Sequence, residues 1–199
     1  MIALIDYKAG NLTSVKKALA ALGAEVFVPG VPADLADAGG IIVPGVGHFG
    51  ATRALNQDWV DAILGRLGEG RPLFGICLGM QWLYEGSDEA PDCAGLGLLS
   101  GRCYRLATVR DIKVPHVGWN SLAINSDASI VDGVATGSQV YFTHSYVAPV
   151  TGDTVAVTEH GERFAAIVQR GYVAGVQFHP EKSGDVGLRI LRNFVELVG

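Results

Sequence analysis

Cys77 has the surroundings that nucleophilic chemistry requires. The apolar run at residues 72–76, typical of a buried strand, leads directly into Gly75-Ile76-Cys77-Leu78-Gly79, and a helical pattern follows. A strand, a Gly-x-Cys-x-Gly turn and a helix form the thiol version of the nucleophile elbow, which holds the reactive side chain above the sheet edge. A helix N-terminus favours a thiolate, and the backbone N–H of Leu78 would face a developing oxyanion. We therefore predict that Cys77 is a nucleophile.

A buried structural role is the alternative for any free cysteine, and we prefer it for Cys93 and Cys103, which lack such surroundings. No two of the three cysteines have C-x-x-C spacing. This sparse set argues against a disulfide framework and against a structural zinc site. No cluster of histidines and acidic residues has ligand spacing either, so we expect neither a metal nor another cofactor.

His179 is the best candidate for the base that a cysteine nucleophile needs. It ends the strand-like run at residues 173–178 and precedes Pro180-Glu181. Parallel strands carry catalytic residues at their carboxyl ends, so His179 and Cys77 can meet. Pro180 favours an extended His179, and two-residue periodicity then puts Glu181 on the same side of the chain. A carboxylate there can accept one ring N–H and direct the other nitrogen at sulfur.

The other four histidines are weaker candidates for the base. His48, His116 and His144 have no carboxylate two residues away, and a structural role is the alternative for each. His160 stands in Glu159-His160-Gly161-Glu162, a pattern typical of a solvated hairpin turn. We therefore expect none of these four to act as the base.

The elements that must position these residues alternate in the first half of the chain. Strand-like runs lie at residues 2–5, 25–28, 40–43 and 72–76. Helical periodicity runs from Asn11, as the N-cap, to about Leu22, then over residues 51–67 and about 78–84. Strands that alternate with crossover helices imply a parallel sheet covered on both faces.

The second half is rich in short β-type runs, at residues 114–117, 140–142, 154–158, 164–168 and 173–178. They indicate antiparallel strands added to the parallel sheet. We expect Ser183 to cap a C-terminal helix that ends near Leu197. The stretch 85–97, with three glycines and a proline, is expected to be an irregular loop.

Length and composition exclude several classes of protein. The 199 residues fit one domain, which we expect to span residues 1–199. The net charge of −5, without a long basic run, disfavours nucleic-acid binding. No apolar stretch approaches the ~18 residues of a membrane helix, and no basic leader precedes the first apolar run. We therefore expect a cytoplasmic α/β protein.

Two motifs together, Gly75-Ile76-Cys77-Leu78-Gly79-Met80-Gln81 and Phe178-His179-Pro180-Glu181, resemble the signature of the class I (triad) glutamine amidotransferases. The resemblance covers the whole chain. It implies the flavodoxin-like fold of that family, a mainly parallel sheet flanked by helices, with antiparallel strands added in the second half. It also implies hydrolysis of glutamine to glutamate and ammonia through a triad of Cys77, His179 and Glu181.

Further motifs resemble the glutaminase subunits of imidazole glycerol phosphate synthases, which serve histidine biosynthesis. In chain order they are Gly10-Asn11-Leu12-Thr13-Ser14-Val15, Pro44-Gly45-Val46-Gly47, Pro115-His116-Val117-Gly118-Trp119-Asn120, Tyr141-Phe142-Thr143-His144-Ser145-Tyr146 and Lys182-Ser183. Asp6-Tyr7 precedes the first of them. Lys8 departs from the pattern, because we expect a glycine directly after Asp6-Tyr7.

The resemblance implies roles for the residues of these motifs. The backbone N–H groups of Leu78 and of Val46 or Gly47 would form the oxyanion hole. The residues implied to line the glutamine pocket are Gln81, His144, Ser145 and Tyr146. Those implied to face a partner are Asn11, Pro115, Trp119, Asn120 and Lys182, and a core position is the alternative for Trp119.

The implied partner is a (β/α)8-barrel cyclase subunit, with which the chain would form a heterodimer. Ammonia would pass through a channel to this cyclase, which makes imidazole glycerol phosphate and AICAR from a phosphorylated ribulose substrate. Because free ammonia would be wasted, we expect glutamine hydrolysis to be slow until the loaded cyclase docks.

The sequence leaves three alternatives open. One is the glutaminase of another triad enzyme, such as pyridoxal phosphate synthase, GMP synthetase or anthranilate synthase, although the motifs at 44–47 and 115–120 favour the imidazole glycerol phosphate assignment. Another is a free-standing cysteine hydrolase of γ-glutamyl peptides, which activity without a partner would reveal. The third is a non-catalytic docking subunit, against which the intact triad argues.

Overall fold

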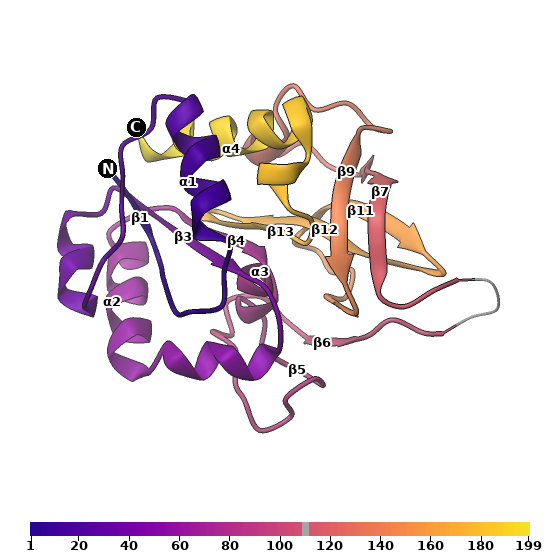
Figure 1. The fold of residues 1–199 in the computed structure, drawn as a ribbon, viewed down its shortest axis with the longest axis horizontal. Helices are drawn as coiled ribbons and strands as arrows, with labels where there is room; N and C mark the ends of the chain where they lie inside the picture. Colours follow the sequence, from indigo (N-terminus) through magenta and orange to yellow (C-terminus); the bar gives the residue numbers. More distant parts are fainter. Residues whose placement is uncertain (109–111) are drawn as a thin grey trace.

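The computed structural model of the protein describes residues 1–108 and 112–199. Its centre is a sheet in the order β2-β1-β3-β4-β13-β12-β11-β8 (Figure 1). Strands β2, β1, β3, β4 and β13 pair in parallel, and β12, β11 and β8 extend the sheet in antiparallel fashion. The predicted parallel sheet with added antiparallel strands is confirmed. These strands are β1 Ile2–Leu4, β2 Val26–Phe27, β3 Gly40–Gly45, β4 Leu73–Cys77, β8 Ala123–Ile124, β11 Thr154–His160, β12 Glu162–Arg170 and β13 Val173–Val176.

Helices cover both faces of this sheet (Figure 1). One core contains the inward residues of α1 and α4, and the other contains those of α2 and α3. Strand β4 serves both, because Phe74 stacks on Phe194 of α4 while its neighbour Leu73 packs in the core of α2. Within the described ranges no helix is long and apolar enough to cross a membrane. The helices are α1 Leu12–Ala21, α2 Gln57–Gly68, α3 Leu78–Trp82 and α4 Gly184–Val198.

Two smaller sheets accompany the central one. Strand β7 (His116–Ser121) pairs with β9 (Gln139–His144) in antiparallel fashion, with His116 opposite His144. Strand β6 (Arg102–Arg105) lies between β5 (Gly86–Ser87) and β10 (Tyr146–Val147). The loop expected at 85–97 therefore begins with a short strand. Short 3-10 segments complete the described fold: η1 Pro32–Asp37, η2 Phe49–Ala54, η3 Ser129–Val131 and η4 Pro180–Lys182.

The helix predicted over residues 51–67 is wrong in its first third. The 3-10 segment η2 ends at Ala54, and α2 begins only at Gln57. The reason is Asn56, whose side chain accepts a hydrogen bond from the Trp59 N–H at 3.3 Å and caps the new helix. The four-residue spacing of apolar side chains continued across this break. The other predicted cap, Asn11 on α1, is confirmed, since its side chain accepts from the Ser14 N–H.

Ser183 precedes α4 but does not cap it with its side chain, contrary to the prediction. Its hydroxyl instead donates to the carbonyl oxygen of His179 at 2.6 Å and accepts from the N–H of Tyr141 at 3.0 Å. Ser183 therefore ties the segment after β13 to strand β9, which matters for the position of His179.

Candidate active site

Cys77 ends β4 and stands directly before α3, as the elbow motif predicts. Its backbone angles are φ 53° and ψ −107°, a sparsely populated region that costs a non-glycine residue about 1–3 kcal/mol. The turn also needs glycines beside it. A β-carbon on Gly79 would lie 1.7 Å from the carbonyl oxygen of Val43, and one on Gly75 would lie 2.6 Å from the backbone of Gly79. The backbone at the centre of the sheet therefore fixes where Cys77 stands.

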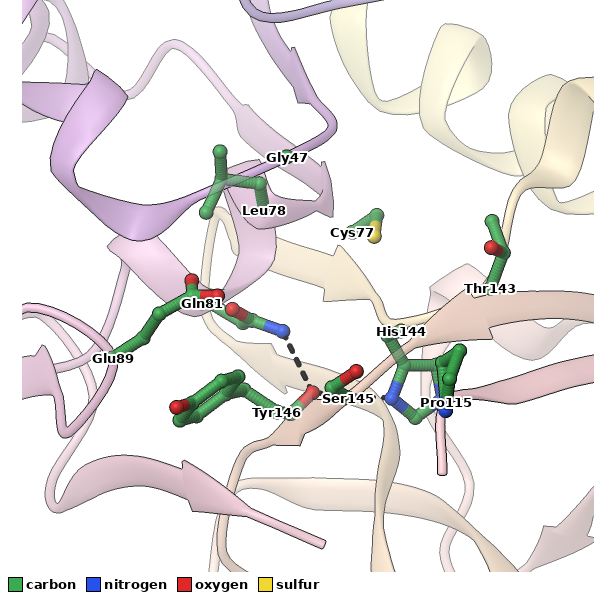
Figure 2. A pocket seen from close by; sticks show the side chains of 10 residues that line it. All are labelled: Gly47, Cys77, Leu78, Gln81, Glu89, Pro115, Thr143, His144, Ser145 and Tyr146. Atoms are coloured by element: carbon green, nitrogen blue, oxygen red, sulfur yellow. Dashed lines mark hydrogen bonds between the residues drawn. The ribbon is translucent and has the colours of Figure 1, made fainter. Parts of the chain in front are cut away.

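A cavity of about 280 Å³ opens beside Cys77 (Figure 2). It lies just below the usual range of small-molecule sites. Figure 2 shows Cys77 on one side of the cavity, with Ser145 and His144 across it. All of the residues expected in the glutamine pocket line this cavity, namely Gln81, His144, Ser145 and Tyr146.

Glu89, Thr143 and Pro115 also line the cavity. The carboxylate of Glu89 accepts a hydrogen bond from the Phe49 N–H at 2.7 Å, which fixes it at the cavity wall. Sequence reasoning missed Glu89 because it lies in the irregular stretch 85–97, where no periodicity assigns a direction to a side chain. Thr143 could have been found, since it stands inside the Tyr141–Tyr146 motif. Pro115, which was expected at a partner surface, is exposed and also lines this cavity.

His179 and Glu181 form a buried pair. The His179 Nδ1 and a Glu181 carboxylate oxygen are 2.9 Å apart, and the two side chains are 2% and 1% exposed. Burial acts to lower the pKa of His179, but the Cys77 sulfur and the Glu181 carboxylate outweigh it and raise this pKa. The other ring nitrogen, Nε2, is buried and has no hydrogen-bond partner among the described residues. It is therefore free to act on Cys77 or on a substrate.

The main chain of His179 is anchored on both sides. Its N–H donates to the Tyr141 carbonyl at 2.9 Å, and its carbonyl accepts from the Ser183 hydroxyl. The first contact joins the segment after β13 to β9, and the Ser183 hydroxyl adds a second link because it also accepts from the Tyr141 N–H. The side chain of His179 is therefore positioned by a neighbouring strand as well as by Glu181.

The backbone N–H groups predicted to form the oxyanion hole differ in their surroundings. Leu78 and Gly47 line the cavity with Cys77, and Gly47 has φ 94°, which suits only glycine. The N–H of Val46 instead donates to the Ala9 carbonyl at 2.6 Å. Of the three predicted donors, Leu78 and Gly47 thus line the cavity beside Cys77, while the Val46 amide is engaged elsewhere.

Two buried carboxamides connect Cys77 with the far wall of the cavity. Gln81 Nε2 donates to the Tyr146 carbonyl at 2.9 Å, drawn in Figure 2, and to Gln177 Oε1 at 3.0 Å. Gln177 Nε2 lies 3.6 Å from the Cys77 sulfur. Gln177 was not among the predicted site residues. The alternation Gln177-Phe178-His179 could have revealed it, because residues 177 and 179 share one side of an extended segment.

A second set of hydrogen bonds runs from the same Tyr146 carbonyl to strand β7. We call His144, His116 and Asn120 the histidine chain. His144 Nδ1 lies 3.1 Å from the Tyr146 oxygen, His144 Nε2 lies 3.1 Å from His116 Nδ1, and His116 Nε2 lies 3.2 Å from Asn120 Nδ2. Burial lowers the pKa of His116 to about 4 and that of His144 to about 3, so both rings are neutral at pH 7. Because a carbonyl only accepts, His144 carries its proton on Nδ1, and His116 must donate to His144.

His160 is not the solvated turn residue that the sequence suggests. It does end β11 at the hairpin to β12, but its ring stacks on His116 with centroids 4.0 Å apart. Its Nε2 also lies 2.8 Å from the Lys113 carbonyl. His160 therefore packs against the histidine chain. Despite this gathering of histidines, residues 1–108 and 112–199 contain no group of three His, Cys, Asp or Glu side chains arranged to hold a metal ion.

The remaining residues expected to face a partner lie on the same side of the molecule as the smaller sheets or at the start of α1. Trp119 is 57% exposed, so the core alternative is wrong, and its ring meets that of Tyr141 edge-on with centroids 6.0 Å apart. The Lys182 ammonium lies 5.9 Å from the same Tyr141 ring. Asn11 and Lys182 are exposed, whereas Asn120 is half-buried and holds the Glu159 carbonyl as well as His116.

Lys8, where a glycine was expected, adopts φ 64°. This left-handed region favours glycine, which gives the expectation its physical basis. The backbone N–H and the ammonium of Lys8 both bond the Asp6 carboxylate, at 2.9 Å each, and lower the pKa of Asp6. The substitution is therefore accommodated within the loop.

Comparison with known proteins agrees with this geometry. The family described as Glutamine amidotransferase class-I matches residues 3–197. Proteins named imidazole glycerol phosphate synthase subunit HisH are similar over nearly the whole chain. The one from Halobacterium salinarum is 49% identical over 98% of this chain and 92% of that protein, and the one from Methanothermobacter thermautotrophicus is 42% identical over 100% and 99%. One from Bacillus cereus is 43% identical over 100% and 95%.

Solved structures also match the fold of this chain. A crystal structure described as a glutamine amidotransferase matches with a TM-score of 0.78, 25% identity and full coverage of both chains. The structure of PurLQS from Thermotoga maritima matches with a TM-score of 0.78 at 20% identity, over 100% of this chain and 98% of that one, and supports the fold alone. By its full-length match and its fold, the chain belongs to the class-I glutamine amidotransferase family.

Proposed function

We propose that this chain is the glutaminase subunit of an imidazole glycerol phosphate synthase. It hydrolyses glutamine at Cys77 and passes the ammonia to a (β/α)8-barrel cyclase subunit, which makes imidazole glycerol phosphate and AICAR in histidine biosynthesis. The observation that carries the proposal is the strained Cys77 at the wall of a polar cavity, with the buried pair of His179 and Glu181 beside it. Relatives named as subunits of that synthase supply the pathway.

The arrangement supports a two-stage mechanism. The Cys77 sulfur attacks the side-chain carbonyl carbon of glutamine, and the C–N bond breaks as protonated His179 gives a proton to the leaving nitrogen, releasing ammonia. Water then attacks the glutamyl thioester while His179 takes a proton, and the C–S bond breaks to release glutamate. Glu181 holds the imidazole through Nδ1 and stabilises its charged form in both stages.

Each stage passes through a tetrahedral oxyanion beside Cys77. The N–H of Leu78, at the first position of α3, and that of Gly47 are the proposed donors. The Val46 N–H would have to leave the Ala9 carbonyl before it could contribute. Release of the Val46 N–H would add a donor to those of Leu78 and Gly47, so this contact supports faster hydrolysis after the cyclase docks than in the isolated subunit.

The proposed docking surface, on the side of the smaller sheets, carries the exposed side chains of Trp119 and Lys182. Exposed Trp residues are frequent anchors of protein interfaces. Trp119→Ala should therefore weaken cyclase binding by about 30-fold, equivalent to about 2 kcal/mol. Because Trp119 is exposed, the same change should leave the stability of the isolated subunit nearly unaltered.

The experiment that tests the function measures glutamate release from glutamine by the wild type and by Cys77→Ala. Each is assayed alone and with a cyclase subunit that holds its ribonucleotide ligand. We expect release that is slow alone, rises in the loaded complex and disappears with Cys77→Ala. Equal release with and without the cyclase would favour a free-standing hydrolase, and release by Cys77→Ala would exclude the triad.

A further inference from the structure

Gln177 touches the nucleophile although it belongs neither to the triad nor to the cavity wall. Its side chain is completely buried, and its carboxamide lies between the Cys77 sulfur and Gln81. The backbone of Gln177 continues the pairing of β13, because its N–H donates to the Ala166 carbonyl at 2.9 Å. The side chain is therefore held by the central sheet.

The hydrogen bonds decide which end of the Gln177 carboxamide faces sulfur. The Tyr146 carbonyl only accepts, so the Gln81 atom 2.9 Å from it must be the amide nitrogen. The same nitrogen lies 3.0 Å from Gln177, so the Gln177 atom there must be the oxygen. The opposite end, 3.6 Å from the Cys77 sulfur, is then the N–H donor. One backbone carbonyl thus sets the direction of both carboxamides.

A donor in this position acts differently on the two forms of Cys77. A thiolate accepts a strong, charge-assisted hydrogen bond, whereas a neutral thiol is only a weak acceptor. The bond also restrains the sulfur at the carboxyl end of β4. We propose that Gln177 is a positioning residue, which holds the Cys77 sulfur and favours its thiolate through the Nε2–H donor. This inference rests on the proposed glutaminase function.

Gln177 and His179 act on Cys77 from one short segment. Between them, Phe178 points to the opposite side and is completely buried in the core of α1 and α4. The Gln-Phe-His order therefore places a neutral donor and a titratable base beside the same sulfur. The other titratable groups that face Cys77 are Tyr7, whose pKa is raised by burial and by Cys77, and His144 and Glu89 across the cavity.

Two substitutions separate a direct action on sulfur from simple support of Gln81. Gln177→Glu keeps an oxygen that accepts from Gln81, but it replaces the donor near sulfur with a second carboxylate oxygen. Gln177→Met removes both hydrogen bonds at similar length. If Gln177 acts on sulfur, thiolate formation falls in the order wild type, Met, Glu. If it only supports Gln81, thiolate formation in Gln177→Met stays at the wild-type level, and Gln177→Glu lowers it only through its added charge.

The readout is the rate at which iodoacetamide alkylates Cys77 in the isolated chain, followed by mass spectrometry between pH 5 and 10. We expect Gln177→Met to lower the rate at pH 7 about tenfold, because the thiolate loses a charge-assisted hydrogen bond, and Gln177→Glu to lower it further. Gln169→Met and Gln169→Glu are matched controls, because Gln169 lies on β12 and bonds Ser129 and the Ile130 N–H instead. They should leave the alkylation profile unchanged.

A measurement on the unaltered protein covers the case in which a variant does not fold. The side-chain amide resonance of Gln177 should shift with pH at the same midpoint as Cys77 alkylation, and Cys77→Ala should abolish this shift. An unchanged resonance across that midpoint, or a wild-type alkylation profile for Gln177→Met, would overturn the role of Gln177. Alkylation needs neither glutamine nor the cyclase, so these results are independent of whether the proposed glutaminase function holds.

Discussion

The two sides of the cavity are held by different kinds of structure. On one side, Cys77 is fixed by backbone, since it sits at the end of a central strand in a strained turn between closely packed glycines. On the other side, the histidine chain is fixed by side-chain hydrogen bonds between β7 and β9, a two-stranded sheet of its own. The backbone around the nucleophile therefore tolerates almost no change, whereas the opposite wall depends on hydrogen-bond donors and acceptors that are paired with one another.

The largest expected effect concerns charge on the nucleophile side, without a change of backbone. Glu181→Gln keeps the shape of the side chain but removes the charge that stabilises protonated His179. We expect kcat for glutamine hydrolysis in the loaded complex to fall by about 10²–10⁴-fold with little change in KM. Steady-state glutamate release measures both quantities. A fall of less than tenfold would mean that Glu181 is not the orienting group.

A backbone change on the nucleophile side should act on folding. The β-carbon of Gly79→Ala would meet the Val43 carbonyl, so we expect a loss of about 3 kcal/mol and a melting temperature lower by about 6–12 °C. Gly65→Ala is the matched control, because Gly65 lies in α2 with open space around its Cα. It should stabilise the protein by up to about 1 kcal/mol. Equal melting temperatures for the two variants would contradict the backbone constraint.

The histidine chain on the opposite wall should make the stability of the protein depend on pH. The pKa values of His116 and His144 are about 4 and 3 in the folded protein and near 6.5 when unfolded, so the unfolded state binds more protons in between. The two neutral histidines therefore contribute their full stabilisation above about pH 6.5, and this contribution falls as the pH is lowered toward 4. His179 has the opposite sign, since its raised pKa gives stability below about pH 6.5 that is lost as pH rises through its folded value.

Urea unfolding between pH 4 and 7 tests this difference. His144→Gln should be less stable than the wild type at pH 7, because it disturbs the hydrogen bonds of the histidine chain. Its stability should nevertheless fall less steeply with acid, because one buried neutral histidine is gone. Parallel curves for the variant and the wild type would show that His144 is not the group that titrates.

The smallest expected effect lies at the outer end of the histidine chain. Asn120→Ala removes the donor to His116 and to the Glu159 carbonyl, and should cost about 1 kcal/mol, or about 2–4 °C in melting temperature. The exposed Asn125 offers a control, and Asn125→Ala should stay within about 0.5 kcal/mol of the wild type. If both variants melt alike, the outer link of the chain contributes nothing measurable.

Local patterns were sufficient to predict the nucleophile side from the sequence. The strand, elbow and helix around Cys77 are encoded within about ten residues. The sequence also predicted the pair of His179 and Glu181, but the extended path expected between them is wrong, because only His179 is extended and Pro180–Lys182 form a 3-10 turn. The parallel and antiparallel halves followed from the same kind of periodicity. Asn56 was missed because apolar spacing continued through it, although its side chain caps a new helix.

Features that depend on distant partners could not be predicted. Ser183 had the right position for a cap, but a backbone N–H of β9, 42 residues away in the sequence, engages its hydroxyl. The pairing of Gln177 with Gln81 spans 96 residues, and the stacking of His160 on His116 joins two different sheets. Nor could the sequence show that the Val46 N–H is occupied by Ala9. Periodicity states which way a side chain points, but not what it meets.

Strand β9 has a consequence for how this protein can vary in length. Its Tyr141 holds the main chain of His179, and three residues later His144 lines the cavity. One inserted or deleted residue between them would turn every following side chain to the other face of the strand and shift the cavity wall against the base. Changes of substrate preference at this wall are therefore expected to arise by substitution of residues and not by insertion or deletion.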